Sequence, residues 1–303
     1  MKLVLANNQN DRFTAFYRDL QSRSNVPFDY ASYRALLFWF DSSSDKRIEV
    51  HNVKTDKALT DYDGVYIKSV FIYELAASTA ICCDYLGIKF VDQELHNPPS
   101  LSKLTMHAKL AATGVLAPKS FGGSKQAVIA SKHRVIEKLT FPAVLKRADA
   151  DRGIDNFKIE NWPEVVNILQ SYADKTIWIL QEFMPNNGYY RVNFYDRKPV
   201  FSIFRKLETR PDSDSRKSHF YKPSGGVNAS LVEITNLPPA VLKTCQDGLN
   251  AMNRQVAGVD CIYDAATDKA YILEVNYNPQ LVTIGSFKDI RQKAFLDSLM
   301  KIC

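Results

Sequence analysis

The chain has 303 residues, of which 46% are hydrophobic and 24% are charged, and its formal net charge is +6. These values are typical of a soluble globular protein with a sizeable core, and they argue against long disorder. So mild a charge does not favour nucleic-acid binding, which needs clustered basic and aromatic residues, but it suits anionic small ligands. No apolar run reaches the roughly 18–20 residues that span a bilayer, and five cysteines without a paired spacing indicate a reducing, cytoplasmic compartment.

The first 97 residues predict a small α/β region in which strands and helices alternate. The expected strands are Lys2–Ala6, Ala35–Phe40, Arg47–His51, Gly64–Ser69 and Ile88–Val91. The expected helices are Asp11–Arg23 and Val70–Leu86. A proline-rich break at His96–Ser100 ends this region.

The rest of the chain predicts further helices and strands around one long loop. The expected helices are Leu101–Thr113, Asn161–Tyr172, Pro238–Val256 and Phe287–Ile302. The expected strands are Pro142–Arg147, Ile177–Met184, Tyr190–Tyr195 and Pro199–Lys206. The polar stretch Glu208–Gly226 is too long for a simple connection, which predicts a functional loop.

The segment Ala257–Leu281 predicts two strands joined by a turn, with three oxygen-bearing side chains. Asp260 lies on the first strand, and Glu274 and Asn276 lie on the second. Residues two apart on a strand point to the same face, and a hairpin can bring the carboxylate of the first strand onto that face too. A few hard oxygen ligands are what Mg²⁺ prefers. The alternative is that these are ordinary turn and edge-strand residues exposed to water.

Basic residues upstream occupy positions that an anion would explain. Lys103 lies at the start of a helix, where the helix dipole opposes a positive charge. Lys146 ends the apolar strand PAVLK, where a lysine is costly to bury unless it is paired. Arg191 and Arg205 each lie in an otherwise apolar strand and would favour a carboxylate or phosphate. Taken singly, Lys103 would more commonly be a solvated surface lysine, whereas Lys146, Arg191 and Arg205 are harder to explain in that way.

Two further segments could contact a nucleotide. The loop that follows the PAVLK strand carries Arg152 and Gly153, and it could fold over phosphates. The strand end Gln181–Met184 could offer backbone hydrogen bonds to adenine, with Phe183 and Met184 as apolar walls. Neither segment is specific by itself.

The order and spacing of these elements resemble the ATP-grasp superfamily, particularly the RimK-type carboxylate–amine ligases. The resemblance covers roughly His96–Gly285 and is most specific at EVNYNP and AGVD. It implies an α/β fold with α+β subdomains. The parts would be an N-terminal pre-ATP-grasp domain over 1–97, a central lid subdomain over 98–180 and a C-terminal subdomain with the magnesium site over 181–303.

The resemblance also implies a role for each candidate residue. The phosphate-binding residues would be Lys103, Lys146, Arg152 and Gly153. The adenine-binding residues would be Gln181, Glu182, Phe183 and Met184, with the backbones of Glu182 and Met184 as the hinge pair. The metal ligands would be Asp260, Glu274 and Asn276. Arg191 would match the arginine of the family's D-x-R pattern, and Arg205 a later arginine that faces the acyl-phosphate; either could stabilise the transferred phosphoryl group as a catalytic residue.

Three positions depart from the family pattern. Tyr189 stands where an aspartate would bind the ribose, so that recognition must differ. The lid loop is poor in glycine and is acidic at Ala148–Asp151, a charge that Arg147 and Arg152 can offset. Asn278 replaces a small serine after the Glu-x-Asn motif.

The implied activity is an ATP-dependent ligase that joins a carboxylate to an amine through an acyl-phosphate, on an amino acid or peptide. Its cofactors would be ATP and Mg²⁺, with Mn²⁺ as a substitute, and its partners would be the acid and amine substrates, with no nucleic acid or membrane. The sequence says nothing about oligomeric state. Two alternatives stay open: a ligase that crosslinks peptides through ester or amide bonds, and a non-catalytic nucleotide-binding module with the same fold.

Overall fold

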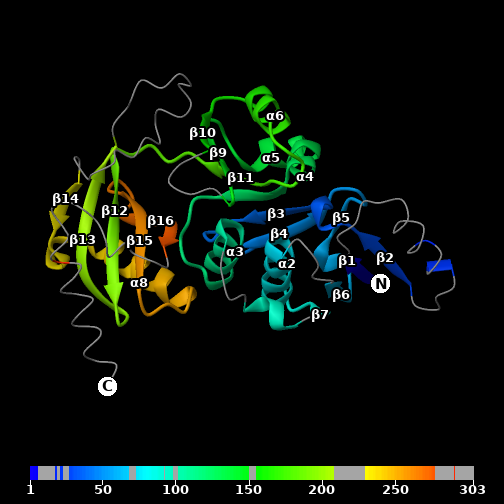
Figure 1. Cartoon of the computed structure of the whole chain (residues 1–303), viewed down its shortest axis with the longest axis horizontal. Helices are drawn as coiled ribbons and strands as arrows, with labels where there is room; N and C mark the ends of the chain where they lie inside the picture. Colours follow the sequence, from blue (N-terminus) through cyan, green and yellow to red (C-terminus); the bar gives the residue numbers. More distant parts are fainter. Residues whose placement is uncertain are drawn as a thin grey trace. The chain divides into compact units, whose positions relative to one another are not determined.

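The computed structural model in Figure 1 describes residues 1–5, 18, 21–22, 27–67, 73–91, 93–97, 102–149, 155–207, 229–276 and 290. The predicted helices Asp11–Arg23 and Phe287–Ile302 and the predicted loop Glu208–Gly226 lie almost entirely outside these residues. The chain forms two compact units. The first comprises Met1–Ala112, Lys119–Ala150 and Ile159–Glu182, and the second comprises Thr113–Pro118, Asp151–Lys158 and Phe183–Cys303. The three-part division expected from the sequence stays a prediction.

A parallel sheet in the first unit is built from short strands near the N-terminus. Its order is β2 (Phe28–Ala31), β1 (Lys2–Leu5), β6 (Gly64–Ile67) and β7 (Lys89–Val91), and every pairing is parallel. Parallel neighbours need a crossover, and α2 (Tyr73–Tyr85) supplies it between β6 and β7. Leu75 and Ala80 of α2 are buried in the same hydrophobic core as Leu3 and Val65.

A second sheet joins strands from the N-terminal region to later ones. Its order is β10 (Asn156–Ile159), β9 (Ala143–Arg147), β11 (Ile177–Glu182), β8 (Ser120–Ser124), β3 (Leu36–Phe40), β4 (Ile48–Asn52) and β5 (Lys57–Ala58). The pairings from β9 to β5 are antiparallel. The strands predicted at Ala35–Phe40 and Arg47–His51 are therefore confirmed as β3 and β4, and β3 lies beside β8 in this sheet.

The glycine-rich strand β8 was not predicted, because SFGGS has poor strand propensity. Its glycines are instead required by close packing. A Cβ on Gly122 would collide with the side chain of Leu104, and a Cβ on Gly123 would lie 2.8 Å from the carbonyl oxygen of Leu36. Helix and neighbouring strand thus approach the β8 backbone at positions where only glycine leaves room.

This part of the chain contains four described helices, three of which begin at a side-chain cap. They are α3 (Lys103–Thr113), α4 (Lys125–Ala130), α5 (Lys132–Lys138) and α6 (Trp162–Gln170), with 3₁₀ turns at Tyr33–Ala35, Leu59–Asp61 and Gln93–His96. The side chain of Asn161 accepts a hydrogen bond from the amide of Glu164, and Pro163 lies in the first turn, so α6 starts where the sequence predicted. The helices α4 and α5 were missed because each is short and Ser131 separates them.

The second unit contains an antiparallel sheet covered by one helix. Its order is β14 (Ala229–Val232), β13 (Lys198–Lys206), β12 (Gly188–Tyr195), β15 (Ala257–Asp264) and β16 (Lys269–Asn276). The helix α8 (Pro239–Ala251) contacts β15 and β16 (Figure 1), after a 3₁₀ turn at Ile234–Asn236. The predicted hairpin is confirmed as β15 and β16.

Gly188 at the start of β12 faces β13 with no room for a side chain. An added Cβ would lie 2.5 Å from the carbonyl oxygen of Arg205 and 2.6 Å from Cζ of Phe204. We expect Gly188→Ala to lower the free energy of unfolding by about 1–3 kcal/mol, because the paired backbone cannot yield without strain. Urea denaturation measures this loss. Gly258→Ala on β15 is the control, since its nearest atom would be 3.4 Å away; equal losses in both variants would contradict the explanation.

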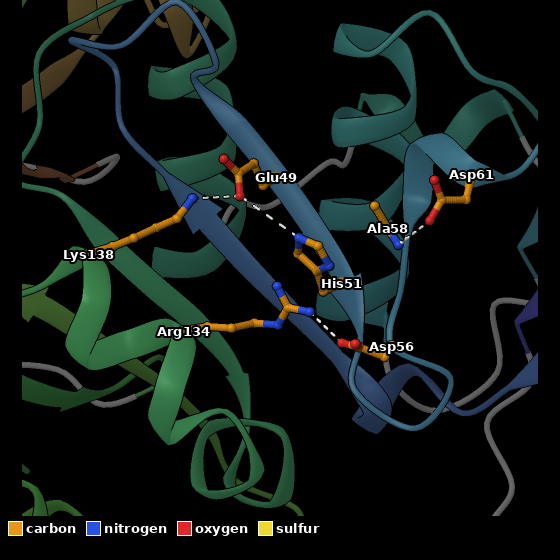
Figure 2. Close-up of polar contacts among 7 residues, drawn as sticks. All are labelled: Glu49, His51, Asp56, Ala58, Asp61, Arg134 and Lys138. Atoms are coloured by element: carbon orange, nitrogen blue, oxygen red, sulfur yellow. Dashed lines mark hydrogen bonds and ion pairs between the residues drawn. The ribbon is translucent and has the colours of Figure 1, made fainter.

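A group of charged side chains, here called the α5 clasp, ties α5 to β4 and the turn after it (Figure 2). Glu49 accepts a 2.6 Å hydrogen bond from Lys138, and Asp56 pairs with Arg134. His51 lies between these pairs, with its Nε2 3.8 Å from Oε2 of Glu49. The α5 clasp therefore joins two segments far apart in the sequence within one unit.

The α5 clasp should weaken in acid because of His51. Burial and the nearby charge of Arg134 lower the pKa of His51 below its ordinary value of 6.5, although Glu49 opposes this. The stability gained from the neutral ring is therefore present above that value and lost as pH falls through the lower folded-state pKa. Between pH 7.5 and pH 5 we expect the free energy of unfolding to fall more in the wild type than in His51→Gln. The difference between the two falls should be less than about 1 kcal/mol. His133→Gln, at an exposed position on α5, should behave like the wild type; if it matched His51→Gln, His51 would not be the source.

Candidate functional site

Three charged side chains form a row across adjacent strands of the second unit. Arg191 on β12 is the direct partner of Asp260 on β15, and Asp260 is the direct partner of Glu274 on β16. Directly paired residues point to the same face of a sheet. Asn276 lies two positions after Glu274, and its Nδ2 is 3.5 Å from Oδ2 of Asp260. The structure thus brings the predicted metal ligands together with one predicted arginine.

Arg191 and Asp260 form a two-pronged ion pair. The Nε and Nη2 atoms of Arg191 donate to Oδ1 and Oδ2 of Asp260, both at 2.6 Å. The Asp260 side chain is 2% exposed and that of Arg191 is 20% exposed. Burial alone would lower the pKa of Arg191, but the charge and hydrogen bonds of Asp260 raise it. This buried pairing is the strong, planar form of an arginine–carboxylate contact.

Gly258 lies beside the Arg191 side chain, with room for a Cβ at ordinary contact distance. A Cβ at this position would lie 3.5 Å from Cδ of Arg191 and 3.4 Å from Oδ1 of Asn193. Gly258 is also the direct strand partner of Asn276. The glycine of the AGVD motif therefore lies in the same patch as the charged row, a position that the sequence did not assign.

The donor chemistry of this face fits Mg²⁺. Two carboxylates and one carboxamide supply hard oxygens from neighbouring strands, as a magnesium site with open positions for phosphate requires. In the part of the chain that the structure describes, no three His, Cys, Asp or Glu side chains form a metal cluster. A third oxygen on this face would come from the amide of Asn276. Arg191 uses one lone pair on each oxygen of Asp260. Since Asn276 also donates to Oδ2, the second lone pair of Oδ1 is the one left for a metal.

Arg205 and Tyr189 occupy the same face of this sheet. They are direct strand partners on β13 and β12, and Tyr189 is two positions before Arg191. The ring of Tyr189 is buried at 6% exposure. The Nε atom of Arg205 is buried, with no hydrogen-bond partner among the described residues. The two predicted arginines are therefore diagonal neighbours, and within the described part of the chain the Nε–H of Arg205 is an unused donor.

A buried polar network in the first unit holds Lys146. Its Nζ atom donates a 2.8 Å hydrogen bond to Oε1 of Gln181. The Nε2 atom of Gln181 lies 3.1 Å from Oγ of Ser120 and 3.3 Å from Nε2 of His107. Lys146 is only 6% exposed, as the strand PAVLK suggested. The side chain of Gln181, a residue of the predicted adenine segment, is thus hydrogen-bonded inside the first unit.

Lys103 begins α3, the helix that carries His107. It is half-buried, and its charge acts on Glu74 and His107. Burial, followed by the charges of Lys146 and Lys103, lowers the pKa of His107 well below 6.5. Sequence reasoning missed His107 and Ser120, since a histidine on a helix and a serine in a glycine-rich strand carry no motif.

The predicted adenine segment lies where β11 ends. Glu182 is the last residue of the first unit, and Phe183 begins the second. The amide of Glu182 donates to the carbonyl of Lys119 at 2.9 Å, and the carbonyl of Met184 accepts from Asn186 at 2.8 Å. Two backbone groups of the predicted hinge pair, the amide of Glu182 and the carbonyl of Met184, are therefore already hydrogen-bonded within the protein.

Phe183 is contacted by a lysine that the sequence did not single out. The Lys158 ammonium lies 4.9 Å from the centre of the Phe183 ring. The predicted lid residues Arg152 and Gly153, and the departure at Asn278, lie outside the described residues.

A family model for the RimK-like ATP-grasp domain matches residues 102–296. The chain belongs to the RimK-like ATP-grasp family. No match to a curated protein sequence was found. Membership confirms the family expected from the order of lysines, hinge segment and Glu-x-Asn strand, and it places the chain among the ATP-grasp ligases.

Solved structures of ATP-grasp ligases are similar over nearly the whole chain. The D-alanine–D-alanine ligase of Bacillus anthracis is 13% identical, with 99% of this chain and 96% of that chain covered and a TM-score of 0.50. The VanG D-Ala:D-Ser ligase of Enterococcus faecalis is 14% identical, with coverages of 99% and 98% and a TM-score of 0.51. These likenesses confirm the α/β ATP-grasp fold. Within the described residues of this RimK-like protein, no helix is long and apolar enough to cross a membrane.

Proposed function

We propose that the protein is an ADP-forming carboxylate–amine ligase that acts on an amino acid or peptide. The observation that carries the proposal is the row Arg191–Asp260–Glu274, with Asn276 beside it on one face of the sheet. This row combines a donor set for Mg²⁺ with an arginine suited to a phosphoryl group. The buried Lys146 of the first unit adds a second cation whose charge suits phosphate oxygens.

The reaction needs two displacements. A carboxylate oxygen attacks the γ-phosphorus of ATP, the bond to the bridging oxygen breaks, and ADP leaves. The amine nitrogen then attacks the acyl carbon, the carbon–oxygen bond to phosphate breaks, and the nitrogen loses its proton as inorganic phosphate departs. In such phosphoryl transfers the protein contributes positioning and charge stabilisation rather than a covalent intermediate.

Each proposed residue has a defined task. Magnesium, when bound by Asp260, Glu274 and Asn276, supplies charge neutralisation on phosphate oxygens. Lys103 and Lys146 bind the phosphates of ATP as point charges. Arg205, whose Nε has no partner among the described residues, and Arg191 orient the transferred phosphoryl group. The backbone of Glu182–Met184 holds adenine, with Phe183 and Met184 against its ring.

A peptide-crosslinking ligase that forms esters is the second catalytic proposal, because the same acyl-phosphate can be attacked by a hydroxyl group. A non-catalytic nucleotide-binding module is favoured by one observation: the buried Tyr189 occupies the ribose aspartate position. We further propose that the chain divides into the three parts 1–97, 98–180 and 181–303. We also propose that the protein is cytoplasmic and that Mn²⁺ can replace Mg²⁺.

The test is a screen of ATP turnover against carboxylic acids, amino acids and short peptides, alone and in pairs. We expect ADP and phosphate to form only when an acid and an amine acceptor are both present, and the product to resist hydroxylamine as an amide does. A hydroxylamine-labile product would indicate an ester. Formation of AMP and pyrophosphate would overturn the mechanism, and nucleotide binding with no turnover across the panel would favour the non-catalytic module.

A further inference from the structure

The buried amide of Gln181 connects Lys146 to a histidine that has no assigned role. The Oε1 atom of Gln181 faces the Lys146 ammonium at 2.8 Å, and its Nε2 atom faces Ser120 and His107 at 3.1 and 3.3 Å. These four side chains come from β9, β11, β8 and α3, and all four are buried. A fully enclosed polar group must match every donor to an acceptor, because a mismatch leaves a buried atom unsatisfied.

The orientation of the Gln181 amide follows from this matching. An ammonium group can only donate hydrogen bonds, so the atom of Gln181 that faces Lys146 must be its carbonyl oxygen. The amide nitrogen, which can only donate, is then directed at Ser120 and at the imidazole of His107. The ring atom Nε2 of His107 must therefore be an acceptor, which places the ring proton on Nδ1.

His107 can meet this demand only while it is uncharged. A protonated imidazole donates from both nitrogens, so its Nε2 would confront the amide nitrogen of Gln181 with a second donor. Turning the amide by 180° would relieve that conflict but would present its nitrogen to the Lys146 ammonium. The charged groups that act on His107 are Lys103 on its own helix and Lys146 on β9, and both oppose a positive ring. Burial and these lysines accordingly lower the pKa of His107 well below 6.5.

We propose that His107 is a positioning residue that, as a neutral hydrogen-bond acceptor, holds the Gln181 amide in the orientation that fixes the Lys146 ammonium for nucleotide phosphate. The proposal rests on the phosphate-binding role given to Lys146. It assigns His107 no contact with substrate. It also makes the nucleotide affinity of this protein depend on the protonation state of the buried His107 ring.

The test measures the affinity for a non-hydrolysable ATP analogue, with Mg²⁺, from pH 5 to pH 8 by calorimetry. For His107→Phe, which keeps a ring but removes the acceptor, we expect binding about tenfold weaker at pH 8, since one buried donor loses a partner. We also expect its pH dependence to be shallower than that of the wild type. Ser120→Ala is the matched control: it removes the other acceptor of the same amide, so it should weaken binding and keep the wild-type pH profile.

A double-mutant comparison separates this proposal from the one on which it rests. In a Lys146→Met background, His107→Phe should change nucleotide affinity less than twofold, because its effect passes through the missing ammonium. If Lys146→Met alone binds the analogue as tightly as the wild type, the phosphate-binding role of Lys146 is wrong. If Lys146→Met binds weakly but His107→Phe keeps the wild-type affinity and pH profile, the positioning role of His107 is wrong.

A measurement on the unmodified protein does not depend on how the variants fold. Nitrogen chemical shifts of labelled histidine identify which ring atom carries the proton. We expect His107 to be neutral at pH 7 with the proton on Nδ1. A charged ring at this pH, or a proton on Nε2, would overturn the proposal.

Discussion

Glu274→Gln will reduce acid-dependent ATP turnover by about 10²–10³-fold, the cost of removing one group that stabilises charge in a transition state. The substitution preserves the shape of the side chain and removes its charge beside Asp260, its direct strand partner on β15. The measurement is the steady-state rate of ADP formation with the best substrate pair from the screen. The loss should appear in kcat at saturating ATP and Mg²⁺.

The control for Glu274 is Asp268→Asn in the turn of the same hairpin. Asp268 is exposed and has a positive φ of 50°, a conformation that asparagine tolerates. The Asp268→Asn substitution removes one negative charge from the same hairpin. It should leave turnover within about twofold of the wild type, as expected for an exposed polar substitution outside the site. A Glu274→Gln variant with near-normal turnover would show that the magnesium assignment is wrong.

Lys146→Met will also abolish most turnover, and it will weaken nucleotide binding. The methionine retains the apolar stem inside the strand but removes the only positive charge in direct contact with Gln181 among the described residues. Loss of a charged hydrogen-bonding group at a phosphate site costs about 10²–10³-fold in turnover. It should also leave Oε1 of Gln181 unsatisfied and lower the free energy of unfolding by about 1–3 kcal/mol.

Two measurements on Lys146→Met are needed, namely ATP turnover and urea denaturation. Lys243→Met on α8 is the matched control, because its side chain is 77% exposed and its partner Asp247 is on the same helix. That variant should match the wild type in both measurements. Full turnover by Lys146→Met would show that Lys146 belongs to the core rather than to a phosphate site.

The hairpin and the placement of its polar side chains could be predicted because they are local. Glu274 and Asn276 are two apart on one strand, and a tight turn returns the chain to Asp260, so short-range geometry alone brings them together. The ion pair between Arg191 and Asp260 could not be predicted. It depends on the register of β12 against β15, two strands that are distant in the sequence. Register is set by the whole sheet rather than by either strand.

The fold of the first unit shows the same limit. The strand predicted at Ala35–Phe40 is confirmed, but its antiparallel pairing with β8 could not be foreseen from a segment with two adjacent glycines. Glycine is needed at these two positions because the side chain of Leu104 and the carbonyl of Leu36 approach the β8 backbone too closely for a Cβ. The network around Gln181 likewise requires β8, β9, β11 and α3 to be assembled first, so no short motif could signal His107.

The pairing of Arg191 with Asp260 has a consequence for how this protein is made. A group of bare acidic ligands repels itself, so many metal sites depend on their ion in order to fold. Here an internal guanidinium already balances the most deeply buried acid. We therefore expect the newly synthesised chain to reach its native structure in a cell depleted of divalent cations, with the proposed metal site already assembled. On this proposal the supply of metal would limit the activity of the protein and not its folding.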